Sequence, residues 1–358
     1  LFDLTGLQKE ANKIFGFTAE ETLKIAQNLY EKHKCLSYPR TDFKHLTNEM
    51  KPEVKKVLNS LKELDYKIEY FETALENLDT PCEHIFCSEK VGDHHGLIPM
   101  SKLPNDEISE DDFKIYDLIV RRLLASLNED HIYESTRITT AVSDIDFHSS
   151  GTTIVRNGWK EIYEFKTESL DEEEDKQKLP KLNKGESVEC EQFQIKQNKT
   201  KPKKRMTEAD LLNFMQKPHL YLNEEESQNE HVSNLKEKGI GTPATRANII
   251  KTLVDKQYME RQGKTLVPTE KGMFLIQNLE PESLKSPVMT SEWEEKLRQI
   301  EEGKLKPIDF ANEMNAYVKD VVEKAKGLSK KFKPKGETSK GSFGKPKLRS
   351  ISSILNQT

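Results

Sequence analysis

The stretch that decides the reading of this sequence is Leu36-Ser37-Tyr38-Pro39-Arg40-Thr41-Asp42, which follows a predicted pair of helices. A phenol has an ordinary pKa of about 10, so a tyrosine that attacks phosphorus needs a nearby cation or base. Arg40 supplies a planar guanidinium that can pair with phosphate oxygens through two parallel bonds. Tyr38 is therefore a candidate nucleophile. By itself, the stretch is more often a core tyrosine before a proline turn, and that alternative stays open.

A second candidate element is the loop Asp93-His94-His95-Gly96-Leu97-Ile98-Pro99. Histidine can donate a hydrogen bond to a phosphate oxygen or move a proton near neutral pH. Two adjacent histidines in a loop bounded by Gly and Pro are also typical of exposed residues without a chemical role. The loop alone does not decide between these two interpretations.

A third element is Lys238-Gly239-Ile240-Gly241-Thr242-Pro243-Ala244-Thr245-Arg246-Ala247. Thr242 as N-cap and Pro243 at the first helical position predict a helix start, whose free N–H groups and dipole favour an anion. The sequence contains no G-x-x-x-x-G-K-[S/T] loop, so ATP hydrolysis is not supported. We interpret the element as a nucleic-acid phosphate site, with plain helix capping as an equal alternative.

The order and separation of the three elements closely resemble the type IA DNA topoisomerases, in particular their topoisomerase III branch. Residues 37–42 match the family's nucleophile motif, and residues 94–99 resemble its His-x-Ala-Ile-x-Pro segment, although Gly96-Leu97 replaces Ala-Ile. Residues 239–247 match the start of its single-strand DNA-binding helix. The resemblance covers about residues 1–325 and includes two later landmarks, Pro268-Thr269-Glu270-Lys271-Gly272 and Met289-Thr290-Ser291-Glu292-Trp293-Glu294.

The resemblance implies an ATP-independent transesterification. Tyr38 would attack single-stranded DNA and form a 5′-phosphotyrosyl link, another strand would pass through the gap, and the 3′-hydroxyl would reseal it. Arg40 and His94 would stabilise charge on the phosphate oxygens. Residues of the third element would hold the DNA backbone: Lys238, Gly241, Thr242, Thr245 and Arg246. The expected partner is single-stranded DNA, and the chain is expected to be a monomer.

The acidic residues that hold Mg²⁺ in this family lie in an N-terminal Toprim domain, which carries a Glu and an Asp-x-Asp cluster. Asp144-Ile145-Asp146 matches this cluster in letters only, and we expect no metal ligands in the chain. The chain, which opens with Leu1, is therefore expected to be a fragment without Toprim. Mg²⁺ is expected for the full enzyme, and a Toprim-bearing segment could come from elsewhere. The alternatives are a non-catalytic remainder that binds single-stranded DNA, or a decayed product without activity.

The predicted fold class is α+β and multidomain. Residues 1–130 read as a helical lid domain that bears the nucleophile. Residues 131–205 read as β-rich hinge strands, with a turn at Ser149-Ser150-Gly151 and a further strand from Val188 to Ile195. Residues 206–325 show helices followed by a hairpin, which is typical of a winged-helix-like domain, and the family resemblance makes it the one that binds single-stranded DNA. Together these parts would form part of the torus of the family.

Residues 326–358 are predicted to be a basic, disordered tail. The whole chain carries 56 Lys or Arg and 61 Asp or Glu, a net charge of −5, yet from Lys324 to the C-terminus ten cations accompany one acid. Such a tail would add salt-sensitive, sequence-independent DNA affinity.

Hydropathy and cysteine use set the remaining expectations. No apolar run approaches the ~20 residues of a membrane-spanning helix, and no signal peptide opens the chain, so a cytoplasmic protein is expected. The four cysteines (Cys35, Cys82, Cys87 and Cys190) form no C-x-x-C pair, which predicts reduced thiols. A metal site around Cys82 and His84 is the weaker alternative.

Overall fold

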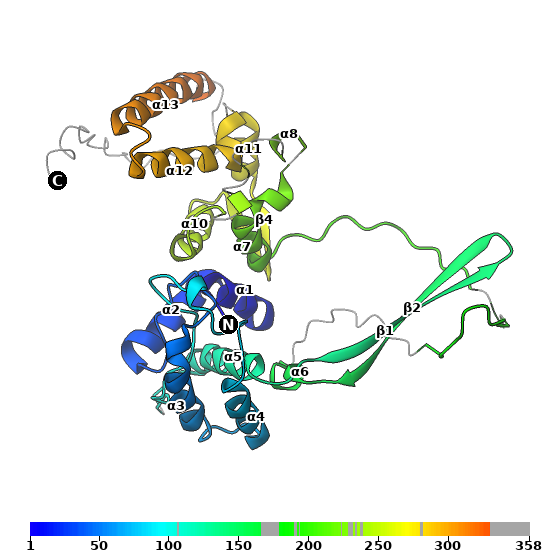
Figure 1. The fold of residues 1–358 in the computed structure, drawn as a ribbon. Helices are drawn as coiled ribbons and strands as arrows, with labels where there is room; N and C mark the ends of the chain where they lie inside the picture. Colours follow the sequence, from blue (N-terminus) through cyan, green and yellow to red (C-terminus); the bar gives the residue numbers. More distant parts are fainter. Residues whose placement is uncertain are drawn as a thin grey trace.

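The computed structural model describes residues 1–105, 107–165, 179–189, 192, 194–222, 224–227, 232, 235–236, 239–279 and 282–329. A helical part carries the N-terminus, a long two-stranded hairpin projects from it, and an extended segment returns to a second, mainly helical part (Figure 1). The predicted mixture of helices and antiparallel strands is confirmed. No helix among the described residues is long and apolar enough to cross a bilayer.

The first part, residues 1–165, consists of helices followed by the hairpin. Its elements are α1 (Leu4–Phe15), α2 (Ala19–Asn28), the π-helical turn η1 (Leu29–His33), η2 (Asn48–Met50), α3 (Lys51–Leu61), α4 (Ile68–Leu78), η3 (Ser88–Lys90), α5 (Glu110–Ser126), β1 (Ile132–Val142), β2 (Ile145–Arg156) and α6 (Trp159–Ile162).

Local signals in the sequence explain where α1 and α2 begin and end. The Asp3 carboxylate accepts the Gly6 N–H at 2.6 Å and caps α1, which ends at Gly16 with a φ of +77°. A capping box begins α2, because Thr18 Oγ1 accepts the Glu21 N–H at 3.1 Å and Glu21 accepts the Thr18 N–H at 2.8 Å. Each helix therefore begins beside a residue whose side chain satisfies a free N–H.

One continuous apolar core holds the first part together. It joins α1, α2, α3, α4 and α5 to two non-helical segments, which contribute the buried Leu36 and Leu97. Burial of Leu36 fixes the backbone just before Tyr38, and burial of Leu97 fixes the backbone just after His94. Large members of the core include Leu7, Leu29, Leu58, Leu61, Phe71, Tyr116, Ile119 and Leu123.

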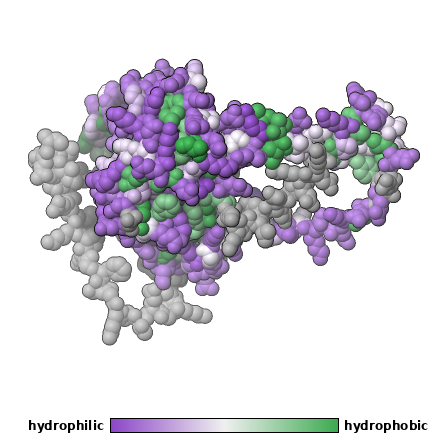
Figure 2. Space-filling view, turned by 90° about the horizontal axis from the view of Figure 1, so that it is seen from below, coloured by the Kyte–Doolittle hydropathy of each residue, from purple (hydrophilic) through white to green (hydrophobic). Residues whose placement is uncertain are grey.

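The hairpin β1–β2 pairs over its whole length, with Val142 opposite Ile145. The predicted turn at Ser149-Ser150-Gly151 is wrong: these residues lie inside β2, and the chain reverses at residues 143–144, where Ser143 has a φ of +54°. Continuous pairing of eleven residues outweighs the local preference of Ser and Gly for turns. Both strands are mostly exposed, and apolar side chains are visible on this projecting arm (Figure 2).

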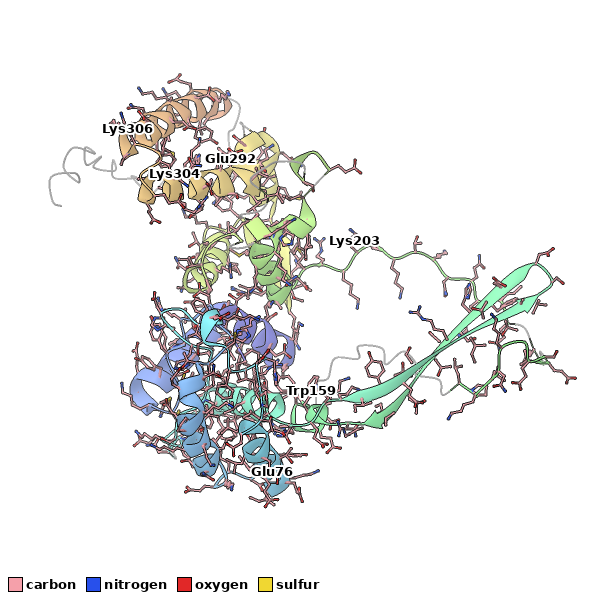
Figure 3. The ribbon with its side chains drawn as sticks, viewed as in Figure 1. Glu76, Trp159, Lys203, Glu292, Lys304 and Lys306 are labelled. Atoms are coloured by element: carbon pink, nitrogen blue, oxygen red, sulfur yellow. The ribbon has the colours of Figure 1, made fainter. Side chains whose placement is uncertain are left out.

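The segment after the arm departs from its prediction. Where it is described between Val188 and Ile195, the chain is extended and exposed but belongs to no strand. The two long strands pair only with each other, so the described part of the chain offers this segment no partner ladder. From residue 194 to residue 205 the chain continues, exposed, as the connection to α7, with Lys203 on this connection (Figure 3).

The second part begins at residue 206. Its elements are α7 (Glu208–Gln216), η4 (Pro218–Tyr221), α8 (Glu224–Ser227), α10 (Pro243–Asp255), β3 (Met259–Gln262), β4 (Thr265–Pro268), α11 (Glu270–Asn278), η5 (Glu282–Lys285), α12 (Pro287–Glu301) and α13 (Pro307–Ser329).

The helices α7 and α10 and the hairpin β3–β4 follow the predicted order of a helical domain with a wing. Gly272 at the start of α11 is required, because a Cβ there would lie 2.0 Å from the Tyr258 carbonyl oxygen. The winged-helix assignment itself stays a prediction. A small apolar cluster joins this part to the first, since Ala19 of α2 packs with Leu212, Met215, Ala247 and Ile250.

Candidate active site

Backbone pairing brings the two candidate catalytic segments together. The Ser37 N–H donates to the Ile98 carbonyl at 3.0 Å, and the Ile98 N–H donates to Ser37 Oγ at 3.1 Å. One step further along, the Met100 N–H donates to the Cys35 carbonyl at 2.9 Å. Two segments that are about 60 residues apart in sequence are therefore held in fixed register beside Tyr38.

The rings of Tyr38 and His94 are in contact. Their centroids lie 4.4 Å apart with an interplanar angle of 43°, and both side chains are exposed, Tyr38 by 37%. Arg40 lies two residues beyond Tyr38 with an exposed side chain. The arrangement brings an exposed phenol and an exposed imidazole into contact, with an exposed guanidinium two residues further along the same segment.

Gly96 explains how the histidine loop reaches this position. It is buried, its N–H donates to the His45 carbonyl at 2.9 Å, and a Cβ there would lie 2.9 Å from the carbonyl carbon of Lys44. The backbone of this chain therefore favours glycine where the family pattern has alanine. The departure noted in the sequence has a local steric reason and leaves His94 beside Tyr38.

The N-terminus of α10 has the geometry expected of a helix start preceded by glycines. Gly239 and Gly241 have φ values of +71° and +64°, and the Thr242 N–H donates to Thr245 Oγ1 at 2.9 Å. Thr242 and Thr245 are both exposed. Lys238 lies outside the described residues. The exposed hydroxyl of Thr245 is placed where it can meet a ligand at this helix end.

Arg246, by contrast, is almost fully buried, with 3% of its surface exposed. Its guanidinium donates to the carbonyls of Ile240 and Gly241, at 3.0 Å each, and to Thr5 Oγ1 at 2.9 Å. Burial lowers the pKa of the guanidinium, and the nearby carboxylates Asp3 and Asp42 oppose that shift. In this conformation Arg246 connects α10 to α1. Its contact with DNA stays a prediction, and that contact would require the two helices to separate.

The start of α1 links the nucleophile segment to the second part of the chain. The Leu4 N–H donates to the Thr41 carbonyl at 2.9 Å, three residues beyond Tyr38. The adjacent Asp3 carboxylate, besides capping α1, accepts a bond from Gln216 Nε2 at 3.4 Å. Asp3 and Thr5 were not among the sequence-predicted site residues; the capping signal could have located Asp3, but nothing local indicates Thr5.

Further polar bonds cross the same contact between the two parts. Lys9 Nζ donates to Gln216 Oε1 at 2.9 Å, the Ala209 N–H donates to Asn12 Oδ1 at 3.1 Å, and the Ala19 N–H donates to Glu208 Oε1 at 3.0 Å. Among the described residues, the apolar burial at this contact comes from the small cluster around Ala19. An interface of this composition resembles contacts between domains that can separate.

The described residues contain no group of three or more His, Cys, Asp or Glu that could hold a metal ion. The weaker alternative of a site near Cys82 is not supported, because Cys82 Sγ donates to the Asn77 carbonyl at 3.1 Å and His84 Nε2 lies 3.0 Å from the Ser126 carbonyl oxygen. Asp144 lies in the turn at the tip of the arm. These residues do not fit a magnesium site.

Comparisons with known proteins identify the family to which the chain is related. A family profile described as DNA topoisomerase matches residues 1–312. The chain is 39% identical to DNA topoisomerase 3 of Bacillus licheniformis over 335 residues, which are 93% of this chain and 46% of that protein. It is 37% identical to DNA topoisomerase 3 of Bacillus subtilis over 336 residues, again 93% and 46%. The chain thus spans about half the length of the curated relatives it matches.

A solved structure also resembles the whole arrangement. Full-length topoisomerase I from Thermotoga maritima aligns with a TM-score of 0.52 at 22% identity, covering 90% of this chain and 50% of that protein. At this identity the similarity supports the fold alone.

Proposed function

This chain belongs to the type IA DNA topoisomerase family, in its topoisomerase III branch, and from that premise we propose that it breaks and rejoins single-stranded DNA through a covalent bond to Tyr38. The observation that carries the proposal is the contact between the exposed rings of Tyr38 and His94, held by the backbone pairing of Ser37 with Ile98. A nucleophile that is accessible, fixed in register and next to a hydrogen-bond donor is what this reaction needs.

The reaction exchanges one phosphodiester for another. The Tyr38 oxygen bonds to phosphorus and loses its proton, while the bond from phosphorus to the 3′ oxygen breaks and that oxygen takes up a proton. The downstream strand is then held as a 5′-phosphotyrosyl ester, and attack by the 3′-hydroxyl restores the DNA. Because the number of phosphodiester bonds is conserved, the cycle requires no ATP.

Arg40 and His94 act on the phosphate group in this proposal. A guanidinium and an imidazole N–H stabilise the negative charge that develops on the non-bridging oxygens, each contributing about 2–4 kcal/mol by analogy with oxyanion donors. His94 is in ring contact with Tyr38, and Arg40 follows on the same segment. Loss of either side chain would therefore lower the cleavage rate far more than DNA affinity.

The helix start at α10 is proposed to hold the strand upstream of the cleaved bond. Thr242 and Thr245 present exposed side chains at this helix end, Gly241 leaves room for a strand to approach, and Lys238 would add charge nearby. These groups contact the backbone and set register, so they carry no base preference. Arg246 would join them only when its bond to Thr5 opens.

The proposed domains follow the predicted boundaries: a lid at 1–130, a hinge at 131–205, a winged-helix-like DNA-binding domain at 206–325 and a basic tail at 326–358. Passage of a second strand requires the lid to part from the DNA-binding domain. The polar bonds of Lys9, Asn12 and Glu208 across this contact, with little apolar burial, support such a separation.

Magnesium is proposed as a requirement of the complete enzyme. Its ligands would come from the part of the family's length that this chain does not span, for example a Toprim-bearing segment. The chain is proposed to act as a monomer on its DNA substrate.

The test is a denaturing gel of the chain mixed with a 3′-labelled single-stranded oligonucleotide and Mg²⁺, with Tyr38→Phe as control. For a 5′-phosphotyrosyl link the labelled downstream piece stays with the protein, and the adduct disappears in Tyr38→Phe while DNA affinity changes less than about threefold. An adduct of equal yield in Tyr38→Phe would refute the role of Tyr38 as the nucleophile. Absence of any adduct, with retained binding, would mean that the chain alone only holds DNA.

The helix start is tested by binding. Thr245→Ala should weaken single-strand affinity at several salt concentrations. Thr252 is an exposed threonine about two turns further along the same helix, and Thr252→Ala should leave the affinity unchanged. Thr252 Oγ1 donates to the Asn248 carbonyl, so this control also removes a local hydrogen bond. Equal affinities of the two variants would refute the role of Thr245.

A further inference from the structure

The helix that leads to Tyr38 ends in an unusual way. The last turn, η1, is π-helical from Leu29 to His33, and the next residue, Lys34, has left-handed backbone angles with a φ of +58°. The Leu29 carbonyl accepts from the Lys34 N–H and also from the Cys35 N–H, the latter at 3.1 Å. Single π-turns and left-handed non-glycine residues are strained and occur often beside functional sites.

The consequence of this turn is a ring contact between residues eight positions apart. Tyr30, within η1, meets Tyr38 edge to face, with ring centroids 5.5 Å apart and an interplanar angle of 79°. This is a favoured geometry for aromatic pairs. Lys34 Nζ in turn lies 5.6 Å from the centroid of the Tyr30 ring. The ring of Tyr38 therefore has Tyr30 as one neighbour and His94 as another.

From this geometry we propose that Tyr30 is a positioning residue for Tyr38. The inference rests on the proposed function of Tyr38 as nucleophile. Tyr38 is 37% exposed, so its ring would sample several rotamers if only one side were supported. Tyr30 is half-buried on a helix end, and its ring restricts those rotamers before DNA binds. Orientation of the attacking group is then already set when the phosphate arrives, which raises the cleavage rate without changing affinity.

The first test separates rate from affinity. In the full chain, Tyr30→Leu should lower the rate of adduct formation about threefold to tenfold, the size expected for one aromatic pair, while Kd for the oligonucleotide changes less than about twofold. Tyr30→Phe should restore the rate, because the contact with Tyr38 is between the two rings and does not involve the hydroxyl. A parallel loss of affinity, or a Phe variant as slow as the Leu variant, would overturn the proposal.

The second test needs no catalysis and therefore distinguishes this proposal from the proposed function. The chain is labelled with 3-fluorotyrosine, and the ¹⁹F resonance of Tyr38 is identified by its loss in Tyr38→Phe. Tyr30→Leu should shift and broaden that resonance, and Tyr30→Phe should restore its line width. An unchanged Tyr38 resonance in Tyr30→Leu would overturn the proposal, whether or not the parent chain forms an adduct.

A matched control is available in the second part of the chain. Tyr317 packs edge to face against Trp293 with the same centroid distance, 5.5 Å, and an interplanar angle of 87°. Tyr317 belongs to α13 and Trp293 to α12, and both helices lie away from α2 (Figure 1). Tyr317→Leu removes an equivalent aromatic pair and should leave the Tyr38 resonance unmoved. If it moves that resonance as much as Tyr30→Leu does, the effect is a general loss of structure and the proposal fails.

Discussion

The bond between Arg246 and Thr5 offers the sharpest test of how the two parts of the chain are held together. Arg246 Nη1 donates to Thr5 Oγ1 at 2.9 Å across the contact between α10 and α1, and both residues are buried. Replacing Thr5 with Val keeps the shape of the side chain and removes only the acceptor. Replacing Arg246 with Met removes this bond together with those to Ile240 and Gly241.

The expected magnitudes follow from the number of bonds lost. A hydrogen bond to a charged group contributes about 1.5–3 kcal/mol, so Thr5→Val should lower the free energy of unfolding by about that amount. Arg246→Met also leaves two partly buried carbonyls without this donor, and about 3–5 kcal/mol is expected. The parent, the two single variants and the double variant form a double-mutant cycle. Because the double variant cannot lose the shared bond twice, this cycle should give a coupling energy of about 1.5–3 kcal/mol between Thr5 and Arg246.

The assay is urea unfolding of the four proteins, followed by circular dichroism and by the fluorescence of Trp159 and Trp293, one in each part of the chain. The control cycle uses Glu20 and Lys251, an ion pair across the same contact whose side chains are both close to half exposed. Water screens that pair, so its coupling should be far smaller than that of the buried bond. A coupling below about 0.5 kcal/mol for Arg246 and Thr5 would refute the reasoning.

Three further predictions concern single positions. Gly158→Ala should lower the free energy of unfolding by about 2–4 kcal/mol, because Gly158 has a φ of +53° and a Cβ there would lie 2.4 Å from a carbonyl oxygen. Gly185 has a φ of +87° but no atom within 4 Å of the added Cβ, so Gly185→Ala should lower the free energy of unfolding much less in the same urea titration. Burial raises the pKa of Cys35 to about 11, so its alkylation by iodoacetamide at pH 8 should be about tenfold or more slower than that of the half-buried Cys87, as mass spectrometry of each peptide would report. The folded chain holds the Cys35 proton more tightly than the unfolded chain, so the contribution of the protonated thiol to stability is complete below the ordinary pKa of 9.0 and is lost as the pH rises through about 11. Alkylation of Cys35 as fast as that of Cys87 would contradict the prediction. Tyr116→Phe should change the unfolding free energy by less than about 0.5 kcal/mol, since its buried hydroxyl has no hydrogen-bond partner among the described residues, and a loss above about 1 kcal/mol would show that a partner exists.

The features that could be predicted from the sequence are those fixed by neighbouring residues. The helix start at Thr242 depends on Thr242 and the adjacent Pro243, and it occurs as predicted. The capping box of Thr18 and Glu21 is equally local, since it joins residues three positions apart. The mixed fold class follows from helical and strand periodicities that are equally local. The proximity of Tyr38 and His94 came instead from the order of motifs shared with a family, since no periodicity relates positions so far apart.

The features that could not be predicted depend on distant partners. Ser149-Ser150-Gly151 has the composition of a turn, but strand pairing carries the chain past it to a reversal at Ser143, whose neighbours give no strong turn signal. The segment from Val188 has the composition of a strand and no ladder to join among the described residues. The burial of Arg246 depends on Thr5, 241 residues away, so a position that looks like a surface cation is an internal one.

The arm formed by β1 and β2 has a mechanical consequence. Its strands of eleven and twelve residues extend about 35 Å at roughly 3.3 Å per residue, and among the described strands they pair with each other alone. The foot of the arm is firmly fixed, because the Trp159 N–H donates to the Glu129 carbonyl at 2.8 Å and Arg156 pairs with Glu129 at 3.1 Å. A rotation of about ten degrees at this foot would displace the tip by about 6 Å over that length. Lever geometry of this kind turns a small angular change beside α5 and α6 into a large displacement of the tip, so the contacts of Glu129 at the foot determine where the tip lies.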